Sequence, residues 1–157
     1  MSGDAKSGLL HLRRAHADDA RLLADIHWRA RAAAMPWLPV VHALDETRSW
    51  MATVVLARQE VWFAVRDGEA AGFVALAGGW VEQLYIDPPA WHLGAGSLLL
   101  DHAKQRQAEG FQLWTFQRNE MARNFYRKHG LVEVRVTDGR DNEEKQPDVL
   151  LAWTPAS

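Results

Sequence analysis

Apolar and polar positions along the chain follow two periods, one typical of strands and one typical of helices. Alternation or short apolar runs predict strands over residues 9–14, 61–66, 70–77, 80–86, 111–116, 131–137 and 149–153. Apolar residues at helical spacing predict helices over residues 18–35, 45–56, 94–107 and 121–129. Punctuating residues support these limits, because Asp67-Gly68 favours a hairpin and Pro36 and Gly130 end helices.

The predicted elements follow the order β-α-α-β-β-β-α-β-α-β-β, which indicates an α/β fold with a mixed (α+β) sheet. We expect strand 111–116 to run parallel to strand 80–86, because a helix connects them. No repeat or linker interrupts the pattern, so a single domain over residues 9–153 is predicted. Residues 1–8 are small and polar, and we expect them to form a flexible tail.

Composition narrows the function without naming it. The chain has 157 residues, of which 48% are hydrophobic and 24% charged, as is usual for a globular protein. Its 18 basic and 20 acidic residues offer no case for a nucleic-acid partner or an anionic membrane. There is no apolar signal core, so a cytoplasmic location is expected. The absence of cysteine excludes a thiol nucleophile, and the histidines lack metal-ligand spacing, so no metal is expected.

The most informative stretch is residues 84–100, where a short strand leads through a proline-containing turn into Gly94-Ala95-Gly96 and a helix. Glycines at a helix N-terminus form an anion-binding loop, since free amides point at the ligand. A Walker loop would need a lysine where Ser97 follows Gly96. A dinucleotide loop would need a third glycine where Leu99 stands. Both interpretations are therefore weakened.

This stretch resembles the pyrophosphate loop of the GNAT superfamily of N-acetyltransferases, in its bacterial small-domain type. The family pattern is Gln/Arg-x-x-Gly-x-Gly/Ala, and Gly94 and Gly96 match it. The departure is Trp91, which stands at the Gln/Arg position. Either a nearby cation such as Arg118 or Arg123 compensates, or coenzyme affinity is reduced.

A second segment, NEMARNFYRKHGL, resembles the family signature Asn-x-x-Ala-x-x-Phe-Tyr-x-x-x-Gly-Phe. The matching positions are Asn119, Ala122, Phe125, Tyr126 and Gly130. Together, the two segments imply the GNAT fold, in which the parallel central strands splay apart.

The resemblance implies an acetyl-CoA-dependent N-acetyltransferase whose primary-amine acceptor attacks directly in a ternary complex. The acceptor would be a small molecule or a peptide, and the fold is compatible with a homodimer. A non-catalytic acyl-CoA-binding sensor or regulatory module is the alternative. The coenzyme-binding residues implied are Leu84, Tyr85, Ile86, Trp91, His92, Leu93, Gly94, Ala95, Gly96, Ser97, Asn119 and Tyr126.

The resemblance also assigns the two catalytic roles. Glu82 would accept the proton of the amine, although it could equally be an exposed strand residue, and the neighbouring polar Gln83 leaves this open. Tyr126 would protonate or stabilise the leaving thiolate, with core packing as its alternative. Asn119 would bind the pantetheine arm or cap the following helix.

The acceptor would meet residues 28–50, the wall on the acceptor side of this fold. We expect Trp28, Trp37, His42 and Glu82 to bind it, since aromatic rings and acids suit a cationic amine. Each tryptophan could instead belong to the core. We expect the acidic loop 138–148 to be a solvated loop, with closure over the same site as the alternative.

Overall fold

The computed structural model describes residues 9–156, so the tail predicted for residues 1–8 lies outside the described part. Seven strands form one mixed sheet in the order β1-β2-β3-β4-β5-β7-β6. The strands are β1 (Leu10–Arg14), β2 (Glu60–Arg66), β3 (Glu69–Ala77), β4 (Trp80–Ile86), β5 (Phe111–Phe116), β6 (Val132–Thr137) and β7 (Asp148–Trp153). This mixed α/β architecture confirms the predicted fold class.

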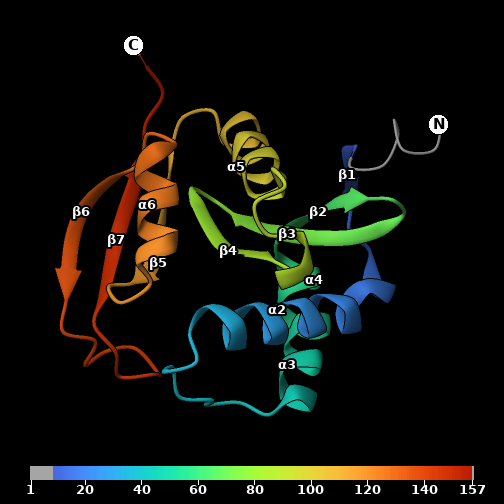
Figure 1. Ribbon diagram of the computed structural model, residues 1–157, viewed down its shortest axis with the longest axis horizontal. Helices are drawn as coiled ribbons and strands as arrows, with labels where there is room; N and C mark the ends of the chain where they lie inside the picture. The colour runs from blue at the N-terminus through green and yellow to red at the C-terminus, as the bar shows by residue number, and fades with distance from the viewer. Residues whose placement is uncertain (1–8, 157) are drawn as a thin grey trace.

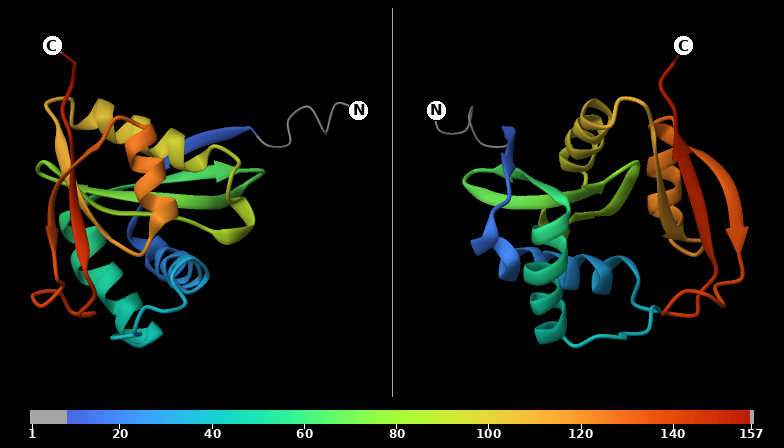
Figure 2. Two further views of the ribbon diagram at one scale, coloured as in Figure 1. Left: turned by 60° about the vertical axis from the view of Figure 1, so that its left-hand side comes forward. Right: turned by 180° about the vertical axis from the view of Figure 1, so that it is seen from behind.

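The helices cover both faces of the first four strands (Figures 1 and 2). Helix α5 lies on one face, and α2 with α3 and α4 lies on the other, while α6 packs beside β5 and β7. The helical elements are η1 (Ala17–Asp19), α2 (Ala20–Ala34), α3 (Leu44–Trp50), η2 (Met51–Val55), α4 (Leu56–Arg58), η3 (Pro88–Ala90), α5 (Ala95–Arg106) and α6 (Glu120–Lys128). The helix predicted over residues 45–56 is thus divided by a π-helical turn, Met51–Val55.

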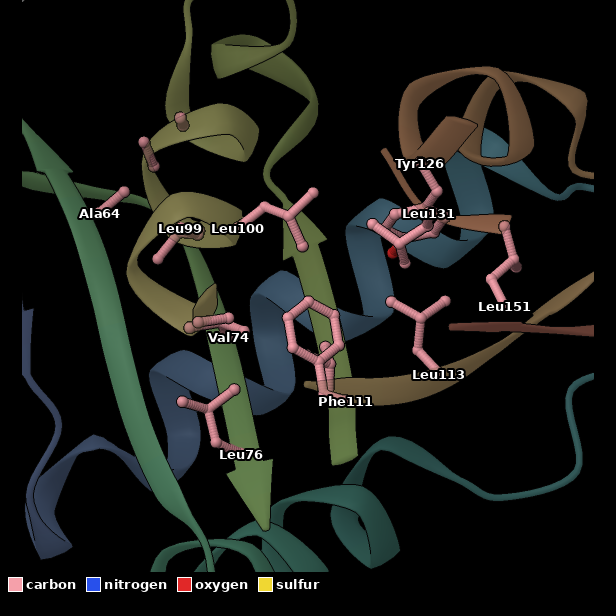
Figure 3. Close-up of a cluster of buried hydrophobic side chains, with 14 of the residues drawn as sticks. Ala64, Val74, Leu76, Leu99, Leu100, Phe111, Leu113, Tyr126, Leu131 and Leu151 are labelled. Atoms are coloured by element: carbon pink, nitrogen blue, oxygen red, sulfur yellow. The ribbon is translucent and has the colours of Figure 1, made fainter. Parts of the chain in front are cut away.

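Two apolar clusters hold these layers together. Alternate residues of β3 belong to the two clusters. Val74 and Leu76 pack with α5, whereas Phe73 packs with α2. Figure 3 shows the α5 cluster, in which Leu99 and Leu100 lie over β3. A strand buried on both faces reads as a continuous apolar run, which is how β3 reads.

The sheet opens in its middle, between β4 and β5. These strands are parallel and share one register pair within residues 9–156, Trp80 with Gln112. By contrast, β5 is paired with β7 along its whole length. Figure 1 shows β4 and β5 diverging beyond this point. The predicted splay of the parallel strands is confirmed, and it leaves backbone groups of β4 unpaired on its β5 side.

In the outer strand β6, the valines that alternate with polar residues face solvent and not the core. Val132, Val134 and Val136 are exposed, whereas Glu133 turns toward α6 and pairs with Arg123 at 2.7 Å. Its register with β7 shifts between Glu133 and Arg135. In the described part of the chain, no helix is long and apolar enough to cross a membrane.

Candidate active site

Strand β4 carries a β-bulge at Glu82. Val81 pairs with Leu76 of β3 and Gln83 pairs with the adjacent Ala75, so Glu82 is the extra residue. Val81 therefore faces α5 with Leu76, whereas Gln83 faces α2 with Ala75. The bulge brings two consecutive polar residues to the edge of the splay, which simple alternation would not do.

A first cavity of about 640 Å³ lies between the open end of β4, the start of α5 and helix α6. Both predicted catalytic residues, Glu82 and Tyr126, line it. Every predicted coenzyme-binding residue lines it except Leu93, whose side chain is exposed instead. The two sequence segments that suggested a coenzyme site thus meet around one space.

The loop before α5 has the geometry of an anion cradle. His92 and Gly94 both adopt positive φ, 64° and 95°, and Gly94 caps the helix. Leu98 is the first amide of the helix to bond back, to the carbonyl of Gly94 at 3.0 Å, which leaves the preceding amides for a ligand. A Cβ at Gly96 would lie 3.1 Å from Cζ of Phe125, so a side chain there would crowd the cavity.

Trp91 does not replace the missing arginine or glutamine by donating to a ligand. Its indole Nε1 donates to the carbonyl of Ile86 at 2.7 Å. This bond ties the turn back to the last residue of β4. Trp91 therefore holds the loop in place, and its N–H group is already used.

The cations proposed to compensate for Trp91 lie elsewhere. Arg123 is bound by Glu133, and Arg118 lies over the ring of Trp37 at 4.3 Å. Lys128 of α6 lines the first cavity instead. An ammonium group and open amides are a donor set that fits a pyrophosphate.

Helix α6 brings Tyr126 and Asn119 to the same cavity. Tyr126 is only 7% exposed, and burial raises the pKa of its phenol well above the ordinary value. The hydroxyl therefore keeps its proton at neutral pH. Asn119 caps α6, since its Oδ1 accepts from the amide of Ala122 at 3.2 Å. The cap uses the oxygen and leaves the amide NH₂ group for a ligand.

A second cavity of about 720 Å³ opens on the α2 side of β4. Its walls come from α2, the connection after it, α3 and the acidic loop 138–147. It shares four lining residues with the first cavity, namely Met35, Glu82, Gln83 and Tyr85. The two cavities therefore adjoin across the β4 bulge.

The acidic loop closes the second cavity through two ion pairs. Glu144 bonds to Arg31 of α2 at 2.9 Å, and Arg31 also donates to the hydroxyl of Tyr85 at 3.0 Å. Glu143 bonds to His42 at 3.1 Å. Figure 1 shows the β6–β7 connection meeting the segment between α2 and α3. The expectation of a solvated loop is therefore wrong for Glu143 and Glu144, and the alternative of closure agrees with their contacts.

The pKa values of two histidines in the second cavity are shifted in opposite directions. Burial lowers the pKa of His27 to about 3, with Arg31 adding to the effect, so its imidazole is neutral. Hydrogen bonds that His42 donates to the carboxylates of Glu143 and Glu46 raise the pKa of its imidazole. Four glutamates and one arginine line the cavity, which makes it an acidic site.

Comparisons with known proteins agree with this geometry. The family model described as "Acetyltransferase (GNAT) domain" matches residues 57–133. The Escherichia coli peptidyl-lysine N-acetyltransferase YjaB is 26% identical over 152 residues, covering 94% of this chain and 99% of YjaB. The solution structure of its apo form superposes with a TM-score of 0.77 over the same shares of the two chains. The chain belongs to the GNAT superfamily.

This GNAT protein is accordingly an N-acetyltransferase. It is also similar to the Escherichia coli peptidyl-lysine N-acetyltransferase YiaC, with 29% identity over 62% of this chain and 66% of that relative. The PaiA N-acetyltransferase of Thermoplasma acidophilum was solved in complex with coenzyme A. It shares the fold at a TM-score of 0.69 with 16% identity, over 93% of this chain and 99% of that one.

The predicted acceptor residues of this GNAT protein divide into two groups. Trp28, His42 and Glu82 line the second cavity. Trp37 lines neither cavity, because its ring packs edge-on against Phe116 at 6.0 Å and under Arg118. Aromatic type alone could not separate Trp28, in the second half of α2, from Trp37 in the irregular segment after it.

Several residues of the GNAT site carry no signal in the sequence. Arg31, Glu144 and the side chain of Tyr85 meet only because distant segments converge. Gln83 is visible in the sequence as a polar residue inside an apolar strand, but the bulge that orients it cannot be read from the sequence. Within residues 9–156, no group of acidic and histidine side chains is arranged to hold a metal ion.

Proposed function

We propose that the protein transfers the acetyl group of acetyl-CoA to the ε-amine of a lysine in a peptide or protein. The observation that carries this is the junction of the two cavities across Glu82, Gln83 and Tyr85. An acyl donor in the first cavity and an amine in the second would meet there. The reaction is then a direct transfer in a ternary complex, since both sites are open at once.

The chemistry of the second cavity supports a lysine acceptor. Of its four glutamates, Glu82 is not bound to Arg31 or His42 and would attract an ammonium group. Its apolar wall, which includes Trp28, Leu38 and Trp50, suits a four-methylene stem. The relatives YjaB and YiaC are named peptidyl-lysine N-acetyltransferases, which agrees with this acceptor class.

The first cavity supports acetyl-CoA as the donor. The amides before Leu98, together with Lys128, would hold the pyrophosphate, and the unpaired edge of β4 would hold the pantetheine arm. When bound, the coenzyme supplies a thioester carbonyl that an amine can attack.

The two catalytic residues divide the proton transfers. Glu82 is exposed at the junction, where it accepts a proton from the attacking amine. As the new N–C bond forms and the C–S bond breaks, Tyr126 gives its proton to the departing sulfur, and the nitrogen loses its second proton to solvent. Glu82 then releases its proton to solvent and Tyr126 takes one back, so each acetylated ammonium group releases one proton in total.

Coenzyme A thiol release tests the proposal, measured with lysine peptides and with lysine-free amines as acceptors. Loss of the acid or base in Tyr126→Phe or Glu82→Gln should lower kcat by about 100-fold, the usual contribution of one such group. Coenzyme binding measured by calorimetry should persist in both variants. Tight coenzyme binding without turnover on any amine would contradict the proposal and favour a sensor module.

A further inference from the structure

Gln83 differs from the other buried polar residues of the described part of the chain in that neither of its side-chain polar atoms has a hydrogen-bond partner. It is 8% exposed, yet neither Oε1 nor Nε2 has a hydrogen-bond partner within residues 9–156. The other buried side chains with an unpartnered atom in this part of the protein leave only one such atom each. A buried amide without partners costs folding free energy, so its retention calls for an explanation.

The position of Gln83 suggests that explanation. The bulge at Glu82 turns Gln83 toward α2 and away from the α5 core. Gln83 lines both cavities, and so lies where donor and acceptor would meet. Of the other three shared lining residues, Met35 offers no N–H or O–H donor, the Tyr85 hydroxyl already binds Arg31, and Glu82 has the proton-transfer role.

We propose that Gln83 binds the reacting amine and orients its lone pair toward the acyl carbon. Oε1 accepts a hydrogen bond from an N–H of the amine after Glu82 has taken one proton. Nε2 donates to an oxygen of the substrate on the first-cavity side. The inference rests on the proposed acetyl transfer and adds an acceptor-binding residue to it.

The unpartnered amide gives the proposal an unusual test, because activity and stability should change in opposite directions. Gln83→Met keeps the length of the side chain but removes both polar atoms. Replacing an unsatisfied buried amide by an apolar group of similar shape should raise the melting temperature by about 3 °C. Losing the bond to the amine should lower kcat/KM for a lysine peptide at least about tenfold. The Kd of coenzyme A should stay within about twofold of the parent value.

Gln59→Met is the matched control. Gln59 also has an unpartnered buried oxygen, but it lines neither cavity. Its replacement should leave kcat/KM unchanged. Gln83→Leu, a second apolar variant, guards against an effect specific to methionine.

The outcomes separate this inference from the proposed function. If the parent enzyme acetylates other amines but no lysine peptide, the acceptor class is wrong and the same comparison is made with the amine that reacts. Unchanged kcat/KM in both Gln83 variants would overturn the role of Gln83. A melting temperature below that of the parent protein would also overturn it, because it would show that the amide supports the fold. This measurement applies even if no amine reacts.

Discussion

The two cavities lie on either side of β4, but they differ in whether backbone groups or side chains form them. The first is formed mainly by backbone: positive φ at His92 and Gly94, open amides at the start of α5, and the unpaired edge of β4. The second is formed by side chains, with Arg31 and Glu144 joining segments 113 residues apart. A backbone site depends on local conformation and can serve one common ligand. A side-chain site can be altered by single substitutions, so the second cavity can change its ligand while the first stays the same.

Among the substitutions considered, we expect the largest effect on ligand binding at Gly96, in the first cavity. In Gly96→Val the side chain would be driven against Phe125, whose Cζ lies 3.1 Å from the ideal Cβ. Crowding of this kind should raise the Kd of coenzyme A by about 100-fold, the upper end of what overpacking costs. Calorimetry measures it, with Gly96→Ala as the milder control. Parent-like affinity in the valine variant would show that the loop does not hold the coenzyme.

The corresponding change in the second cavity is Arg31→Met. It leaves Glu144 without its cation in a pair whose side chains are only 22% and 16% exposed. We expect the free energy of unfolding to fall by about 3 kcal/mol, the lower end for a buried pair, as measured by urea denaturation. The KM for the acceptor should rise about fivefold, equivalent to roughly one lost hydrogen bond, while coenzyme affinity is retained.

Arg29→Met is the matched control for this change. Arg29 lies on the same helix and pairs with Asp87 at 2.9 Å, outside the second cavity, with half of its side chain exposed. Its loss should cost at most about 1 kcal/mol and leave the acceptor KM unchanged. Equal acceptor KM values in the two variants would contradict a role for the Arg31–Glu144 pair in forming the acceptor site.

A third prediction concerns the pH dependence of stability, through His27. Its pKa is about 3 in the folded protein against an ordinary 6.5, so the unfolded chain binds the proton more tightly. Its contribution to stability is complete above pH 6.5 and is lost as the pH falls toward 3. Between pH 7 and pH 5 the parent should lose about 2 kcal/mol that His27→Gln does not lose. Urea denaturation of the parent and of His27→Gln at both pH values checks this.

The smallest predicted effect is at Trp91. Trp91→Phe keeps an aromatic ring but removes the bond from the indole to the Ile86 carbonyl. Loosening the loop should weaken coenzyme binding about fivefold, the usual value of one hydrogen bond. Trp91→Arg loses the same bond but supplies the cation of the family pattern. Comparing the two variants therefore separates the effect of the hydrogen bond from the effect of the charge. Unchanged affinity in Trp91→Phe would mean that the loop is held by other contacts.

The features that could be predicted from the sequence are those that depend on residues close to one another along the chain. The strands, helices and coenzyme loop follow from periodicity and from residues such as Pro36 and Gly94, whose conformational preferences act on their own neighbours. The splay of β4 from β5 followed from the family resemblance.

What could not be predicted depends on contacts between distant residues. The bulge at Glu82 is a matter of register with β3, which no local pattern specifies. The closure of the acidic loop needs Glu143 to reach His42, 101 residues away. Trp37 was expected at the acceptor site because aromatic residues look alike in a sequence, whether they line a cavity or pack beside it.

The single register pair between β4 and β5 has a consequence for how the protein opens. Within the one sheet, strands β1 to β4 and strands β5 to β7 are two separately paired sets that share a single register pair, Trp80 with Gln112. Native-state hydrogen exchange should therefore show two protection levels, one for each set of strands. A ligand lying along the gap would bridge them, and the two sets would then exchange and unfold as one cooperative unit. The gap in which we propose that the coenzyme binds would then also decide how cooperatively the domain unfolds.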